Sequence, residues 1–161
     1  MNNWEALSDD SKVWMYGANR ALTASEVTAI DQMLSDFCDA WSAHGTKLDC
    51  GYEIIHNQLI ILGVDEKSAA ASGCSIDTSV QIFRDINSKY DLDLFNRLRS
   101  YHVDSDTIDS LTSKEVQTKV AVSELDSSST FIDMLLSTKG ALNSELIKPM
   151  AQTWLSKYIP V

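Results

Sequence analysis

Side chains that could carry out chemistry gather in three short stretches of the chain. Asp65 and Glu66 end an apolar run, Cys74 stands in the Ser-Gly-Cys-Ser stretch at 72–75, and His44 precedes a glycine. A cysteine at the start of a helix lies beside unpaired backbone amides and the positive end of the helix dipole, which favour a thiolate or a bound anion. These stretches therefore admit two kinds of chemistry: nucleophilic catalysis by a thiol, or binding of a small anion.

The catalytic interpretation gives each side chain one role. Cys74 is the nucleophile, His44 is the base, and Asp65 or Glu66 orients the imidazole, as in a cysteine-dependent hydrolase or transferase. Each residue also has a structural interpretation. Cys74 fits a small buried side chain at a tight turn, His44 fits a cap at a helix C-terminus, and the two carboxylates fit solvated charges that end a strand. Catalysis requires all of these structural interpretations to fail together, so we favour a binding module over an enzyme.

The binding interpretation uses the small and polar residues of the same stretches. Small side chains at 69–71 leave room for a ligand or for close approach of backbone. We expect a small molecule or a protein partner to contact four residues, Ser72, Gly73, Ser75 and Gly45. We expect no cofactor and no metal, because the three histidines are scattered and the cysteines show no CxxC spacing.

The elements that must position these stretches are indicated by periodicity. Residues 12–16 predict a strand. Thr23 and Glu26 form a capping box, and apolar residues recur at three- and four-residue steps after it, which predicts a helix over 24–43. Gly45 is expected to end that helix, since glycine adopts the left-handed conformation without steric cost.

The next segments complete the predicted sheet. Strands at 48–55 and 58–65 predict a hairpin, and the run LIILGV within the second predicts a strand that is central in its sheet or covered on both faces. A second helix is predicted at 76–89 and an edge strand at 97–103. The order β-α-β-β-α-β predicts an α+β fold with a ferredoxin-like split βαβ antiparallel sheet, in strand order 4-1-3-2, with both helices on one face. In this topology the three polar stretches share one end of the sheet.

Residues 1–161 are expected to form a single domain, with a ferredoxin-like core at 12–104 and a C-terminal helical extension at 105–161 packed on it. Thr112 and Glu115 form another capping box and open a short helix, and residues 151–158 predict a last helical turn. The structure of 122–150, which includes the ambiguous apolar segment FIDMLL, is not indicated by any pattern.

Composition limits the partners. Thirteen basic and 23 acidic side chains give a net charge of -10, so the average field repels nucleic acid and anionic lipid surfaces. The first residues lack the pattern of a leader peptide and LIILGV is too short to span a bilayer, so we expect a cytoplasmic protein. The chain has an odd number of cysteines, namely Cys38, Cys50 and Cys74. This count predicts reduced thiols rather than a disulfide framework.

Several segments between residues 13 and 97 carry a family resemblance. They are VWMYGANRALTASEV, WSAHGTKL, LIILGVDE, ASGCSIDTSV and DLDLFNRL. Together they resemble a small family of uncharacterised bacterial proteins that often carry the label "ABC transporter ATPase". The short motifs AHG, VDE and SGCSID make the resemblance specific, and it is loose in the C-terminal part. It implies a bacterial protein but no mechanism.

The sequence excludes the activity in that label. An ABC ATPase needs the loop G-x-x-x-x-G-K-[ST], whose amides and lysine hold the nucleotide phosphates. None of the six glycines is followed by lysine. LIILGVDE has the form of a Walker-B strand and ASGCS is faintly like an ABC signature loop, but these two motifs occur in the opposite order in such ATPases.

Overall fold

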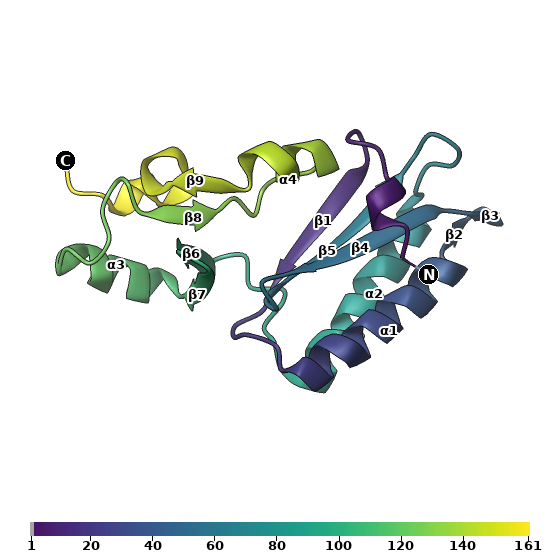
Figure 1. The fold of residues 1–161 in the computed structure, drawn as a ribbon, viewed down its shortest axis with the longest axis horizontal. Helices are drawn as coiled ribbons and strands as arrows, with labels where there is room; N and C mark the ends of the chain where they lie inside the picture. Colours follow the sequence, from purple (N-terminus) through teal and green to yellow (C-terminus); the bar gives the residue numbers. More distant parts are fainter. Residues whose placement is uncertain (1) are drawn as a thin grey trace.

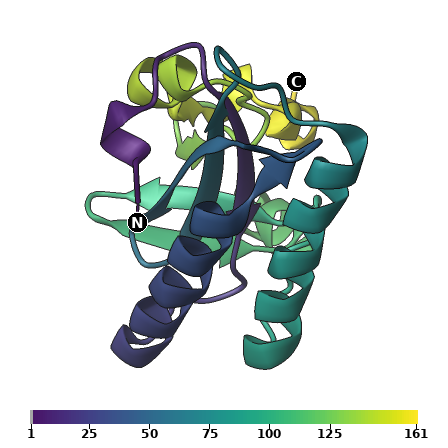
Figure 2. The ribbon, with the colours of Figure 1, turned by 90° about the vertical axis from the view of Figure 1, so that its right-hand side faces the viewer.

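The computed structural model describes residues 2–161. Its first unit is a three-stranded antiparallel sheet in the order β1 (Lys12–Gly17), β5 (Leu59–Asp65), β4 (Asp49–Ile55). Two helices, α1 (Ala24–Ala40) and α2 (Gly73–Tyr90), run side by side over one face of this sheet (Figure 2). A short 3-10 helix, η1 (Trp4–Ala6), precedes β1.

The central strand β5 is buried along its whole length. Ile60, Leu62 and Val64 belong to the core beneath the helices, whereas Leu59 and Ile61 belong to a second core on the opposite face. Side chains alternate between the two faces of a strand, so a continuous apolar run requires cover on both sides. The prediction that LIILGV is central and covered on both faces is confirmed.

The helix α1 begins where the sequence predicted, at the capping box of Thr23 and Glu26, but it ends at Ala40 rather than near residue 43. Trp41 is extended, and a two-stranded hairpin follows, β2 (Ser42–Ala43) and β3 (Thr46–Lys47). His44 and Gly45 form its turn with positive φ angles of 51° and 80°. Two left-handed residues are what a tight hairpin requires. Gly45 therefore closes a hairpin, and the prediction that it ends the helix was wrong.

The helix α2 begins at Gly73, three residues before the predicted start at 76. Ser72 is its N-cap and forms a capping box with Ser75. Cys74 therefore lies inside the first helical turn.

The predicted fourth strand does not join the first sheet. β6 (Ser100–Asp104) pairs instead with β7 (Thr107–Leu111) and β8 (Thr130–Ile132), and β9 (Ile147–Pro149) completes a second sheet in the order β7-β6-β8-β9. The free edge of β1 is occupied by residues 137–139, because the Val13 amide donates to the Ser137 carbonyl at 3.0 Å and the Lys139 amide donates to the Ser11 carbonyl at 2.9 Å. The α+β class stands, and the strand order 4-1-3-2 is not formed.

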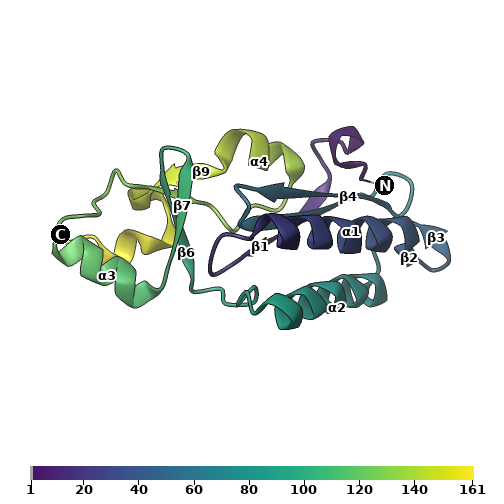
Figure 3. The ribbon, with the colours of Figure 1, turned by 60° about the horizontal axis from the view of Figure 1, so that its bottom comes forward.

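The C-terminal part is mixed rather than helical as predicted. Besides its strands it holds α3 (Ser113–Ala121), α4 (Lys139–Glu145) and two 3-10 helices, η2 (Met150–Gln152) and η3 (Trp154–Tyr158). The capping box of Thr112 and Glu115 opens α3 as predicted. Figures 1 and 3 show this part beside the three-stranded sheet, with α4 next to β1.

The two parts share a buried core on the face of the first sheet that the helices leave free. It joins residues of η1 and β1 to Tyr101, Ile132 and Leu142 of the C-terminal part. Lys139 secures the same contact with a buried ammonium group. Its Nζ donates to the carbonyl oxygens of Trp4 at 2.7 Å and of Leu7 at 2.8 Å.

Cys38 of α1 and Cys50 of β4 form a disulfide, with Cα atoms 5.3 Å apart. The prediction of three reduced thiols was wrong, since helix α1 lies on the sheet with these two side chains facing each other. Cys74 is free and exposed.

Candidate functional site

The three polar stretches lie at one end of the three-stranded sheet, as the topology predicted. We call residues 43–45, 65–66 and 72–75 the loop end. The Trp41 indole Nε1 donates to the Ser75 carbonyl at 2.8 Å, and Glu66 accepts a hydrogen bond from the Ala71 amide at 2.9 Å. Figure 3 shows the β2–β3 hairpin and the start of α2 at this same end.

Cys74 and His44 both lie at the loop end but do not form a pair. Both side chains are exposed, and within residues 2–161 no hydrogen bond joins the thiol to the imidazole. The turn of the β2–β3 hairpin holds His44, whereas the first turn of α2 holds Cys74. The catalytic assignment of these two residues therefore stays a hypothesis without a supporting contact.

The two carboxylates of the loop end hold backbone in place. Asp65 accepts hydrogen bonds from the Lys67 amide at 3.0 Å and from the Ser8 amide at 3.4 Å, and these bonds, that of Lys67 first, lower its pKa. Glu66 forms an ion pair with Lys12 at 2.9 Å, and this contact is the main cause of its lowered pKa. Neither carboxylate contacts the imidazole that it was predicted to orient.

The predicted ligand-binding residues are used by the helix cap and the hairpin turn. The Ser72 amide donates to Ser75 Oγ at 2.7 Å, and the Ser75 amide donates to Ser72 Oγ at 3.2 Å. A methyl group added at Gly73 or Gly45 would meet no atom within 4 Å, so no close backbone approach requires glycine at either position. Ser72 and Ser75 thus satisfy each other, and the two carboxylates are satisfied by neighbouring backbone and by Lys12.

A larger cavity opens on the other side of the molecule. It has a volume of about 470 Å³ and lies between β1, the segment 94–99 and the second sheet, with η2 and η3 at its rim. We call it the inter-sheet cleft. Pockets for small ligands typically measure roughly 300 to 1,000 Å³. The predicted catalytic and ligand-binding residues do not line it.

Cationic side chains are concentrated in the inter-sheet cleft. Its lining includes Arg97, Arg99 and Lys148 with one carboxylate, Asp133, so three positive charges and one negative charge leave +2 in a chain whose net charge is -10. Lys148 is paired with Asp133, which raises the pKa of the lysine. Asp93, which is not part of the lining, pairs with Arg99, so the charge left without a partner is that of Arg97.

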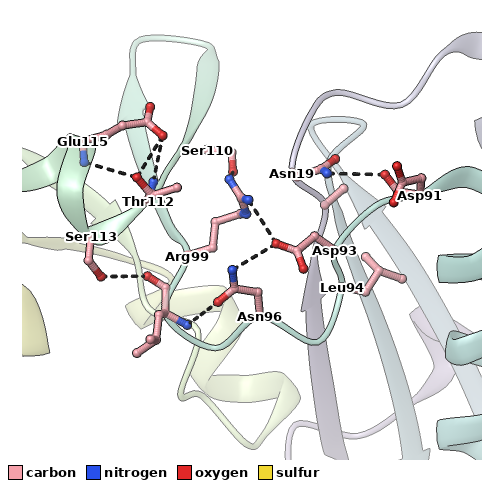
Figure 4. A network of polar contacts seen from close by, with 12 residues as sticks. Asn19, Asp91, Asp93, Leu94, Asn96, Arg99, Ser110, Thr112, Ser113 and Glu115 are labelled. Atoms are coloured by element: carbon pink, nitrogen blue, oxygen red, sulfur yellow. Dashed lines mark hydrogen bonds and ion pairs between the residues drawn. The ribbon is translucent and has the colours of Figure 1, made fainter.

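The two arginines are held differently. Arg99 is 14% exposed; its Nη2 donates to Asp93 at 3.0 Å and its Nη1 to Ser110 at 3.1 Å (Figure 4). Asp93 accepts from Asn96 as well as from Arg99, and these two bonds lower its pKa. Arg97 is exposed, and its one hydrogen bond goes to the Met15 carbonyl at 3.3 Å. Among residues 2–161 no carboxylate pairs with Arg97.

Some polar atoms around the cleft lack partners. The buried Nε of Arg99 and the buried Oγ of Ser100 make no hydrogen bond in the described part of the chain. Ser100 is 5% exposed. Buried polar atoms nearly always have a partner, so each such atom needs an explanation.

Aromatic and aliphatic side chains form the rest of the wall. Tyr101, Phe131 and Trp154 line the cleft together with leucine, isoleucine and methionine side chains. Tyr101 lies against Gly17 of β1, where an added Cβ would stand 2.1 Å from the phenol oxygen. Burial raises the pKa of Tyr101, so it remains a neutral phenol.

The sequence analysis missed this cleft, although part of its signal was visible. Arg97 and Arg99 stand close together in the segment RLRSYHV, which is a local concentration of positive charge in an acidic chain. They lie in the turn that precedes β6, not in the strand itself. The contribution of residues 131–135 and 148–155 depends on the second sheet, which was not predicted.

No protein-family model, no curated protein and no solved structure matches this chain. In the described part of the chain, no group of three or more His, Cys, Asp or Glu side chains could hold a metal ion. No helix within residues 2–161 has the length and apolar character needed to cross a membrane.

Proposed function

We propose that this protein is a small-ligand-binding module whose ligand lies in the inter-sheet cleft. The observation that carries the proposal is Arg97, which has no carboxylate partner among residues 2–161 and lines a cavity of about 470 Å³ in a strongly acidic chain. Apolar walls with a few convergent polar groups are typical of small-molecule sites. The proposed site is therefore the cleft rather than the loop end, where Ser72, Ser75 and the two carboxylates already have partners.

The test is a fragment screen read by backbone amide shifts in NMR spectra of the labelled protein. The set contains neutral, anionic and cationic aromatic fragments of similar size. We expect the fragments that bind to shift the amides of Phe131, Ile132 and Trp154, which line the cleft. Shifts confined to Gly45, Gly73 and Cys74, or no shifts with any fragment, would contradict the proposal.

Catalysis by Cys74 with His44 is the alternative, and it has no contact to support it. The cleft contains neither residue and offers no cysteine or histidine of its own. The small size of the cleft and the negative net charge of the chain argue against nucleic acid as the partner.

The Cys38–Cys50 disulfide stands against the cytoplasmic location expected from the sequence and supplies the test of that location. Disulfides persist in oxidising compartments and are rare in the cytosol. Cells are lysed in acid to preserve the redox state of the cysteines. The protein is then alkylated under denaturing conditions, and its mass is measured. Three alkylated cysteines support a reducing, cytoplasmic location, whereas one alkylated cysteine contradicts it.

A further inference from the structure

The lining of the inter-sheet cleft limits the class of ligand that it can take. Among residues 2–161, Arg97 has no carboxylate partner, and its guanidinium carbon lies 5.7 Å from the centre of the Tyr16 ring. A guanidinium cannot lose its charge near neutral pH and presents its donors in a planar fork that matches a carboxylate. It is therefore a charged donor whose counter-ion the chain does not provide.

Arg99 is held by the fold and is not free in the same way. Asp93 and Ser110 hold its two terminal nitrogens, and its Nε has no acceptor but is buried. A ligand in the open cleft does not reach a buried atom, and Asp93 already balances the charge of this guanidinium. Arg97 is therefore the arginine that can pair with a ligand.

The other walls are suited to an apolar body. Trp154 and Leu135 line the cleft with side chains that are 37% and 80% exposed, and a free inorganic anion would leave these apolar surfaces uncovered. A ligand that joins an anionic head to an aromatic or branched aliphatic group would use both parts of the wall.

We infer that the ligand of the inter-sheet cleft is a small carboxylate with an aromatic or aliphatic body, whose carboxylate binds the Arg97 guanidinium. The inference rests on the proposed function and adds the chemical class of the ligand. Lys148 plays no part in recognition, because Asp133 already pairs with it.

Three probes of one shape test the inference. They are 3-phenylpropanoate, the neutral 3-phenylpropanamide and the cationic 3-phenylpropylamine, titrated into the labelled protein and followed by amide shifts. We expect the acid to bind about tenfold more tightly than the amide, since a charge-assisted hydrogen bond contributes that much. The amine should bind most weakly.

Arginine variants locate the effect. Arg97→Gln should make the acid and the amide bind equally, whereas Arg84→Gln, which removes one arginine charge from the exposed face of α2, should keep the preference for the acid. Arg97→Lys keeps the charge without the planar fork and should retain part of the preference, and it serves if Arg97→Gln does not fold. A preference for the acid that survives in Arg97→Gln would overturn the role of Arg97.

The outcomes separate this inference from the proposed function. Equal binding of acid and amide, with shifts at Phe131 and Trp154, overturns the ligand class and leaves the cleft as a binding site. Failure of all three probes, with neutral fragments still binding there, has the same meaning. Failure of every probe and every fragment overturns both.

Discussion

The loop end and the inter-sheet cleft are both rich in polar groups, but they differ in how those groups are used. At the loop end, Ser72 and Ser75 cap each other and Glu66 pairs with Lys12. In the cleft, Arg97 has no carboxylate partner among residues 2–161, and Arg99 Nε has no partner there either. The difference teaches that the fold can leave hydrogen-bonding capacity unused at a place that residue types and spacing did not indicate.

The largest expected effect comes from comparing two tryptophans, one beside the loop end and one in the wall of the cleft. Trp41 at the loop end is 3% exposed, packs near Phe37 and donates to Ser75. Trp41→Ala should lower the free energy of unfolding by roughly 3 to 5 kcal/mol, as measured by denaturant titration, and should leave binding of 3-phenylpropanoate by the folded protein unchanged. Trp154, which is 37% exposed in the cleft wall, should show the reverse in Trp154→Ala: a small loss of stability and weaker binding. Equal stability losses in the two variants would contradict the distinction between a tryptophan that stabilises the fold and one that serves binding.

The disulfide beside the loop end gives the next effect. Replacing both Cys38 and Cys50 by alanine opens a loop whose ends are 12 residues apart and should cost about 3 kcal/mol. Cys74→Ala is the matched control and should be nearly neutral, because that thiol is exposed and unbonded. Thermal unfolding with and without a reductant measures the stability of both variants. If a reductant leaves the melting temperature of the native protein unchanged, the contribution of this disulfide is refuted.

A pair of glycines tests whether the cleft wall is tightly packed. Gly17→Ala would place a methyl group against Tyr101 and should cost about 1 to 3 kcal/mol while weakening binding of 3-phenylpropanoate. Gly73→Ala at the loop end meets no atom within 4 Å and should cost nothing or stabilise α2 slightly. Equal melting temperatures for the two variants would show that the cleft wall accommodates the added methyl group without loss of stability.

The carboxylates of the loop end predict a pH dependence of stability. Asp65 and Glu66 have pKa values lowered by hydrogen bonds and by Lys12, so they bind fewer protons in the folded state than in the unfolded state at acid pH. Their contribution is complete above the unfolded pKa values of roughly 4 and is lost as the pH falls through the lower folded values. The double variant Asp65→Asn, Glu66→Gln should flatten the slope of unfolding free energy against pH in that acid range. Asp109→Asn, at an exposed position of β7, should leave the slope as it is.

The smallest expected effect concerns the catalytic hypothesis. Cys74 is the free thiol and should be the cysteine that iodoacetamide alkylates in the native protein. His44 forms no hydrogen bond with it, so His44→Gln should leave the alkylation rate unchanged at each pH from acid to alkaline. A clear fall in rate, followed by mass spectrometry, would revive the enzyme hypothesis and reverse the comparison.

Local patterns predicted the elements that depend on local interactions. The capping boxes at Thr23 and Thr112 satisfy amides three residues away, and the apolar run of β5 needs no partner to be recognised. The fourth strand could not be placed, because residues 137–139 occupy the edge of β1 from a distant part of the chain. At Gly45 the sequence pattern is compatible with two local structures, because a glycine that follows a periodic segment suits a helix end as well as a hairpin turn.

Candidate sites follow the same rule. The loop end was located correctly because each of its stretches adjoins a predictable element. The inter-sheet cleft could not be located, because its walls come from β1, β6, β8 and the 3-10 helices, and only the second sheet brings them together.

The contact of Lys139 with Trp4 and Leu7 sets an order on the making of this protein. Synthesis runs from the N-terminus, and domains commonly begin to fold as they leave the ribosome. Here the carbonyls of Trp4 and Leu7 lack their donor until Lys139 has been made, 135 residues after Trp4. The core that holds Val13, Met15, Leu59 and Ile61 likewise includes Tyr101, Ile132 and Leu142, so this face of the sheet gains its cover only after the later segments have been made.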